Sequence, residues 1–202
     1  MERDSSTTDA CPPQLLDLVS AGDQTAFRQL YIHFYKRLYH FALSLVKTRE
    51  PAEEIVEDVF VRIWQQRENL PTIRNLRVYL YTATKNSSLN YLSQKARQSI
   101  TEPFDHIHIG LNPSAVTPEQ ILITAEIYQK IQQAVEALPP RCKMIFKLVR
   151  EDGLKYKEIA EILNISVNTI DAQMAIAVKR ITGAIGSELD FPVNKKAKPS
   201  NG

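Results

Sequence analysis

Cysteine and glycine are both rare in this chain. Its 202 residues include two cysteines, Cys11 and Cys142, which lie far apart, whereas a small secreted scaffold uses more of them. We therefore expect two free thiols in a reducing compartment. The six glycines form no phosphate-binding loop, and no closely spaced cysteine pair is present. Because helix-forming residues abound where glycine is scarce, the composition predicts an all-α protein.

Long apolar runs are missing as well. No run approaches the roughly 20 residues that a helix needs to span a bilayer. The first residues, Met-Glu-Arg-Asp-Ser-Ser, lack the basic start and apolar core of a signal peptide. These absences predict a soluble, cytoplasmic protein that does not insert into a membrane.

The chain also lacks a clear excess of charge of one sign. Its 25 Lys and Arg against 23 Asp and Glu give a net charge of +2, which by itself indicates no nucleic-acid partner. The charges are unevenly placed, however. Residues 99–138 carry one basic and five acidic side chains, whereas residues 139–202 carry 11 basic and seven acidic ones. The distribution therefore says more about partners than the sum does.

The stretch 156–170 has the pattern of a helix, a three-residue turn and the start of a second helix. The first helix has an apolar stripe formed by Ile159, Ala160 and Leu163. Asn164 lies at the bend, where the backbone often needs the left-handed conformation, and Ser166 is a good N-cap for the next helix. This pattern predicts a helix-turn-helix whose second helix enters a DNA major groove. An ordinary pair of core helices is the plainer alternative.

The remaining sequence predicts a series of further helices. Periodicity and capping residues place them at about 24–47, 51–66, 75–97, 118–137 and 140–150, and the last helix of the chain ends near Ala184. The segment 99–118 has little periodicity and several prolines, which is typical of an extended linker. We therefore expect two small helical domains, an N-terminal bundle at 13–98 and a C-terminal helix-turn-helix domain at 119–186. We also expect a loose start at 1–12, a break between helices at 69–72 and a disordered tail at 187–202.

The predicted helix at 51–66 has a concentrated acidic side. Five acids fall within nine residues, with no base among them: Glu50, Glu53, Glu54, Glu57 and Asp58. At 100° per residue the apolar side chains occupy the other half of the helix. The helix dipole favours acids in the first turn, which accounts less well for those that follow. The alternative is a surface that docks on a basic partner, and periodicity alone leaves both open.

The next helix has the opposite character. Between Asn69 and Thr101 there are bases but no acid, with tyrosines and amides interleaved: Arg74, Arg77, Lys85, Lys95 and Arg97; Tyr79, Tyr81 and Tyr91; Asn75, Asn86 and Asn90. Bases neutralise phosphates, rings stack on unpaired nucleobases at roughly 1–3 kcal/mol each, and amides read base edges. The helix is therefore suited to single-stranded or melting DNA. The plainer alternative is that the tyrosines are core, and Tyr79 is expected to be partly so because it shares a face with Leu76.

Taken together, these elements resemble a bacterial sigma factor of the extracytoplasmic-function group. The resemblance is carried by Phe27-Arg-Gln-Leu-Tyr, by the run from Ala52 to Trp64, by the run from Asn75 to Asn86, and by Leu138-Pro-Pro-Arg with the helix-turn-helix that continues to Arg180. It covers most of residues 24–184. The Ala-Glu-Glu-Ile-Val-Glu-Asp-Val-Phe run is specific, and its combination with the downstream helix-turn-helix makes a chance match unlikely.

The resemblance implies partners and roles. Core RNA polymerase would bind Glu54, Asp58, Val59 and Phe60. The −10 promoter element would be recognised and opened by Arg77, Tyr79, Lys85, Asn86 and Asn90. The −35 element would be read as duplex by Ser166, Asn168, Thr169, Gln173, Lys179 and Arg180. The linker would thread through polymerase, an anti-sigma factor would hold the protein inactive, and neither an active site nor a cofactor is implied.

The sequence departs from the family at several of these positions. The family usually has Trp where Tyr79 stands, Asp where Asn90 stands and Arg near Ser93, and these changes keep an aromatic or polar group. Bases are usual near Asp171, Gln173 and Ile176, and none is present here. Either the acid at 171 turns away from the DNA, or −35 affinity is low and tethering to polymerase supplies the rest. As a hypothesis, the amides of Asn168 and Gln173 favour adenine.

Two other classes of function compete with this interpretation. An enzyme with a metal site is conceivable because Asp105, His106 and His108 lie close together, but the sequence shows no nucleophile–base arrangement. A helix-turn-helix regulator that binds a two-fold operator without polymerase is the second. It leaves the acidic helix and the basic tyrosine-bearing helix unexplained.

Overall fold

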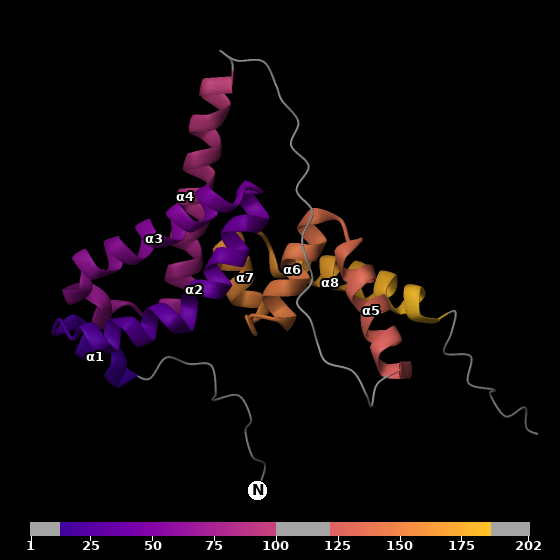
Figure 1. The fold of residues 1–202 in the computed structure, drawn as a ribbon, viewed down its shortest axis with the longest axis horizontal. Coiled ribbons are helices and arrows are strands. Elements are labelled where there is room, and N and C mark those ends of the chain that lie inside the picture. The colour runs from indigo at the N-terminus through magenta and orange to yellow at the C-terminus, as the bar shows by residue number, and fades with distance from the viewer. Residues whose placement is uncertain (1–12, 100–121, 187–202) are drawn as a thin grey trace, which may run out of the picture.

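The computed structural model describes residues 13–99 and 122–186, and all of the secondary structure in these ranges is helical (Figure 1). The all-α prediction is confirmed. The elements in chain order are α1 (Pro13–Ser20), α2 (Gln24–Val46), α3 (Arg49–Gln65), the 3₁₀ helix η1 (Arg67–Thr72), α4 (Leu76–Ser99), α5 (Leu122–Glu136), α6 (Pro140–Arg150), α7 (Tyr156–Leu163) and α8 (Val167–Gly186). The predicted linker and C-terminal tail lie almost entirely outside the described residues.

Local capping chemistry sets where several helices begin. Asp23 starts α2, and its Oδ1 accepts hydrogen bonds from the backbone amides of Thr25 and Ala26 at 2.7 and 2.9 Å. Asn75 starts α4, and its Oδ1 accepts from the amide of Val78 at 3.2 Å. Both starts agree with the prediction. Helix α1 was not predicted from the sequence, and the residues of η1 were predicted only as a break between two helices.

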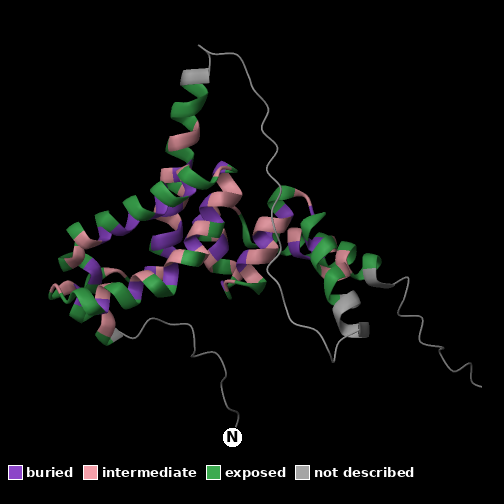
Figure 2. Cartoon of the chain, in the orientation of Figure 1, coloured by how far each residue is buried: buried purple, intermediate pink, exposed green. Residues whose placement is uncertain are grey.

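The N-terminal core lies between α2, α3 and α4. Helix α2 presents buried side chains at helical spacing, and they meet the apolar half of α3 and one face of α4 (Figure 2). The largest are Leu30, Phe34, Leu38, Phe60, Leu80 and Tyr81. An apolar stripe this wide is typical of a helix that packs against two neighbours at once. The exposed sides of α3 and α4 are therefore fixed by the burial of their opposite sides.

The helix-turn-helix forms as predicted. Asn164 adopts the left-handed conformation at the end of α7, with φ 54° and ψ 52°. Ser166 caps α8, because its Oγ accepts from the amide of Thr169 at 3.0 Å. One detail differs from the prediction. The buried residues of α7 are Ile159 and Ile162, whereas Ala160 and Leu163 are half-buried.

The N-terminal and C-terminal helices share a single hydrophobic core. Side chains from Val19 in α1 to Met174 in α8 belong to one buried cluster, and α4 packs directly against α7. A smaller cluster between α5, α6 and α8 is built from Val135, Leu138, Cys142 and Ala177. The two modules therefore touch, although the predicted domain boundaries themselves stay a prediction. Among the described helices none combines the length and apolar character that a membrane span needs.

Candidate protein and nucleic-acid interfaces

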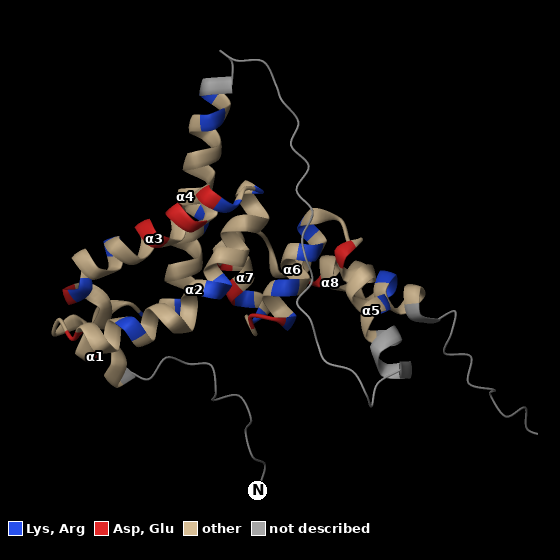
Figure 3. Cartoon of the chain, viewed as in Figure 1, with Lys and Arg blue, Asp and Glu red and all other residues tan. Residues whose placement is uncertain are grey.

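The outer side of α3 is an exposed acidic surface. Glu53, Glu54, Glu57 and Asp58 are all exposed there and lie next to α4 (Figure 3). Asp58 has an ion pair with Arg62 one turn later at 3.9 Å, but both side chains are more than half exposed, so the pair contributes little to stability. The rest of the negative charge stays available for a partner.

Two residues predicted for this surface lie elsewhere. Val59 and Phe60 are only 1% and 2% exposed, because they belong to the apolar half of α3 that packs on α2. Their side chains hold α3 in place and do not reach the outer surface. The exposed acidic surface is therefore formed without them, and of the four residues predicted to bind polymerase only Glu54 and Asp58 are exposed.

A ladder of tyrosines runs along α2 beside the acidic surface. The rings of Tyr31 and Tyr35 stack with centroids 4.8 Å apart, and Tyr39 continues the series one turn on at 6.3 Å. Burial, followed by the charge of Glu57, raises the pKa of Tyr31. The surface is therefore acidic with an aromatic edge. The i, i+4 spacing of the three tyrosines is the signal in the sequence that could have predicted this edge.

Helix α4 keeps a narrow polar stripe exposed. Tyr79, Asn86 and Asn90 lie on one side of the helix and are open to solvent, with Tyr79 38% exposed. The opposite side is buried, and the hydroxyls of Thr84 and Ser88 on it are satisfied within the helix. Thr84 Oγ1 donates to the carbonyl of Leu80 at 2.9 Å, and Ser88 Oγ donates to that of Thr84 at 2.8 Å, as expected for buried polar groups.

The other residues predicted for α4 are arranged differently. Tyr79 is partly covered, as expected, but keeps more than a third of its surface open, whereas Tyr81 is completely buried. Arg77 points toward the C-terminal module, where its guanidinium donates to the carbonyls of Asp152 and Gly153 at 3.5 and 3.3 Å. Lys85 is half-buried at the edge of the stripe. Of the residues predicted to bind the −10 element, the exposed ones are thus the aromatic Tyr79 and the amides Asn86 and Asn90.

The outward side of α8 carries no base over its first two turns. At 100° per residue this side holds Asn168, Asp171, Ala172, Ala175, Ile176 and Lys179, and all of them are exposed. Gln173 is half-buried, and its backbone carbonyl accepts from the Cys142 thiol of α6 at 3.2 Å. Of the other predicted residues, Ser166 and Thr169 form the cap, and Arg180 is exposed on the flank. Asp171 is exposed at the edge of the outward side.

The structure offers no support for the metal-site alternative within its described ranges. The residues suggested for it, Asp105, His106 and His108, lie outside these ranges. Among residues 13–99 and 122–186, no group of three or more His, Cys, Asp or Glu side chains is placed to hold a metal ion.

Comparison with known proteins accounts for both modules. Residues 30–98 match the family described as Sigma-70 region 2, and residues 128–181 match Sigma-70, region 4. The chain is 26% identical over 180 residues to the ECF RNA polymerase sigma-E factor of Escherichia coli, which covers 85% of this chain and 92% of that protein. It is 25% identical over 163 residues to the ECF RNA polymerase sigma factor SigW of Bacillus subtilis, covering 77% and 87%. The chain is a sigma factor of the extracytoplasmic-function (ECF) group.

Solved structures agree on the fold of this sigma factor. The sigma factor RpoE of Bartonella quintana, in complex with the anti-sigma factor NepR, matches with a TM-score of 0.59 at 19% identity, over 80% of this chain and 98% of that one. CnrH, in complex with the cytosolic domain of CnrY, matches with a TM-score of 0.52 at 17% identity, over 87% and 97%. Because region 2 is present as well as a helix-turn-helix, a regulator that acts without polymerase is not favoured.

Proposed function

We propose that this sigma factor divides its work among three exposed surfaces, one for core RNA polymerase and two for promoter DNA. The observation that carries the proposal is the contrast between two adjacent helices of region 2. Helix α3 exposes acids and α4 exposes an aromatic ring and amides on a helix without acids. These chemistries suit a basic protein surface and nucleotides respectively.

The acidic surface of α3 would bind core polymerase. Glu54 and Asp58 are one turn apart on the exposed side, so both can face one partner helix. The half-buried tyrosines Tyr31 and Tyr35 border this surface and would add apolar contact area at its edge. Aromatic residues are enriched where protein interfaces carry most of their binding energy.

The exposed stripe of α4 would recognise the −10 element and stabilise it after melting. Tyr79 can stack on an unpaired nucleobase, and Asn86 and Asn90 can hydrogen-bond base edges. Lys95 and Arg97, both exposed near the end of the helix, would contact phosphates. Arg77 and Lys85 were expected in this set, and their positions make them flanking contributors.

The outward side of α8 would read the −35 element. Asn168 lies at its start, where helix-turn-helix proteins contact base edges, and Lys179 with Arg180 would contact phosphates. Ser166, Thr169 and Gln173 belong to the expected set, of which Ser166 and Thr169 hold the first turn of the helix and Gln173 lies on its flank. The small side chains between these positions allow a close approach to the groove.

The remaining partners follow from the family. An anti-sigma factor would hold the protein inactive, and RpoE of Bartonella quintana is a structural neighbour that was solved in complex with an anti-sigma factor, NepR. Sigma factors are not enzymes, and we infer that this chain has no catalytic activity or cofactor of its own. We further infer that it acts in the cytoplasm, where polymerase and promoters are found.

Charge reversal on α3 tests the polymerase-binding role. In Glu54→Lys with Asp58→Lys, the affinity for core polymerase should fall by about tenfold or more, because attraction becomes repulsion at a close interface. The matched control is Glu68→Lys with Glu161→Lys, which changes the net charge equally at exposed positions on η1 and α7. Fluorescence titration against core polymerase measures both, and equal affinities would refute the role of α3.

A further inference from the structure

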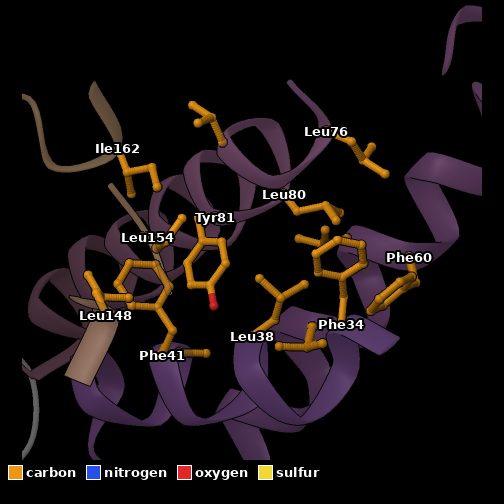
Figure 4. Packing of buried hydrophobic residues seen from close by; sticks show 14 of the residues in the cluster. Phe34, Leu38, Phe41, Phe60, Leu76, Leu80, Tyr81, Leu148, Leu154 and Ile162 are labelled. Carbon is orange, nitrogen blue, oxygen red and sulfur yellow. The ribbon is translucent and has the colours of Figure 1, made fainter. Parts of the chain in front are cut away.

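The outward side of α8 exposes apolar side chains in a module whose larger apolar residues mostly pack inward. Figure 4 shows three of the inward-facing side chains, all packed in the hydrophobic core: Leu148, Leu154 and Ile162. On α8, by contrast, Ile176 is 40% exposed, and Ala172 and Ala175 beside it are exposed as well. Unlike a single exposed apolar residue, a contiguous set of them is typical of a binding surface.

The packing of α8 does not depend on these three side chains. The helix is held in the module by buried residues on its inner side: Ile170, Met174 and Ala177. At about 100° per residue, Ala172, Ala175 and Ile176 all lie within about 80° of Asn168 around the helix. They therefore share the side of α8 that would face the −35 element.

The apolar surface has the length of a short run of base pairs. From Asn168 to Ile176 the helix rises about 12 Å at about 1.5 Å per residue, which matches about three to four base pairs at about 3.4 Å each. Over this length the outward side presents no base, and the first one is Lys179. The acid at its edge, Asp171, has no proton to donate to guanine. Past the amide of Asn168, the centre of this side therefore offers only carbon to the groove.

Thymine is the base whose major-groove edge carries an apolar group. Its C5 methyl lies there, whereas guanine presents two acceptors and cytosine presents an amino donor. Small and apolar side chains contact the thymine methyl. Against a G·C pair the same side chains would cover polar groups and leave them without partners, which disfavours binding. Such a surface both favours A·T pairs and rejects G·C pairs.

We propose that Ile176, together with Ala172 and Ala175, contacts the C5 methyl groups of thymines in the −35 element, so that this sigma factor selects −35 sequences by their thymine methyls. The inference rests on the −35 role proposed above for α8, and it adds the chemistry by which the helix distinguishes one sequence from another. Ile176 has the largest of the three side chains and makes the principal methyl contact. The two alanines let the helix approach the groove closely.

Uracil tests this contact, because it forms the same base pair as thymine and lacks only the C5 methyl. Promoter duplexes with one thymine-to-uracil replacement at a time along the −35 element are titrated with the complex of the full chain and core polymerase. Replacement at a contacted position should lower the affinity about fourfold, the factor that corresponds to one methyl-sized group removed from water. Replacement in the spacer between the two promoter elements should leave the affinity unchanged.

Ile176→Ala identifies the side chain that contacts the methyl group. Because Ile176 lies outside the buried side of α8, its truncation leaves the packing of the helix intact. In I176A at least one −35 thymine should lose its methyl effect, so that thymine and uracil bind equally there. The matched control is Leu18→Ala on α1, which removes the same number of carbon atoms from a side chain that is 49% exposed and should keep every methyl effect.

The outcomes separate this inference from the proposed function. Uracil that binds as tightly as thymine at every −35 position in the wild type would overturn the methyl contact, and methyl effects that all persist in I176A would point to DNA shape and overturn the role of Ile176. Exchange of the whole −35 element for an unrelated sequence tests the −35 role itself. If that exchange weakens binding and uracil does not, only this inference fails, whereas if neither matters, the proposed −35 role fails as well.

Discussion

Helices α4 and α8 both carry proposed DNA contacts, yet their surfaces differ. Helix α4 has bases and no acid, with an exposed ring and amides along one stripe. The outward side of α8 has one amide and small or apolar residues, an acid at its edge and bases only toward its end. Because phosphate neutralisation supplies most of the sequence-independent affinity for DNA, we expect α8 to be the weaker binder of the two on its own.

The difference indicates how the protein divides affinity and specificity. A recognition helix with few bases binds DNA weakly by itself. Tethering to polymerase raises its effective concentration near the promoter, so we expect it to contribute to promoter affinity mainly in the complex. The stripe on α4 would meet unpaired bases under the proposed function, and stacking and amide contacts would then give binding without duplex readout. Substitutions on the two helices should therefore affect different steps of initiation.

Among these substitutions, Asn86→Ala on α4 is expected to have the largest effect, and this effect should be on open-complex formation. Loss of an amide that contacts the melted strand should reduce open-complex formation by about tenfold, since each good base contact is worth about 1–3 kcal/mol. Permanganate reactivity of promoter thymines measures opening, and affinity for core polymerase serves as the control because Asn86 lies outside the acidic surface. Equal reactivity in variant and wild type would remove Asn86 from the −10 site.

A smaller effect is expected for Asn168→Ala on α8. Its amide points outward at the start of the helix, so its loss should lower the preference for adenine at one −35 position by about fivefold. Gln173→Ala is the matched comparison, and its effect should be smaller because Gln173 is half-buried beside α6. Promoter substitution base by base measures both, and a preference that depends on Gln173 alone would reverse this ranking.

Asp171→Lys should reduce the difference in DNA affinity between α4 and α8. Replacing the acid at the edge of α8 by a base should strengthen binding to −35 duplex a few-fold and steepen the dependence of log K on log salt by about 0.9. Glu68→Lys adds the same charge on η1, away from α8, and should leave the slope unchanged. If D171K and E68K give the same slope, Asp171 does not face the DNA backbone.

The smallest effect concerns His40 on α2, whose ring lies within electrostatic range of Lys147 in α6. Burial, then Lys36 and Lys147, lower the pKa of His40, and Glu151 opposes this weakly. The folded protein therefore disfavours the charged imidazole. Its contribution to stability is complete above the ordinary pKa of about 6.5 and is lost as the pH falls below it toward the folded-state pKa. Urea unfolding from pH 7.5 to 5.5 should show a smaller loss of stability in His40→Gln, and an identical loss would contradict this.

Features set by neighbouring residues could be predicted from the sequence. The caps at Asp23, Asn75 and Ser166 and the left-handed bend at Asn164 depend on chemistry within a few residues, and the structure has all four. The exposed acidic side of α3 followed from helical periodicity in the same way. These features required no knowledge of the tertiary structure.

Where periodicity and family resemblance disagreed, periodicity was the better guide. Val59 and Phe60 were assigned to the partner surface by resemblance, although their spacing placed them with the apolar half of α3, and the structure buries them. The burial of Tyr81 and the contact of Asn75 with Glu158 could not be predicted. Both depend on segments far apart in the chain, 83 positions for Asn75 and Glu158, and no local pattern encodes such a pairing.

The most direct test of this division of labour is the affinity of the full chain for a promoter duplex with and without core polymerase. We expect the chain alone to bind weakly and with little sequence preference, and the complex with polymerase to bind specifically and to open the −10 region. Tight, sequence-specific binding of the duplex by the chain alone, unchanged by polymerase, would contradict the account.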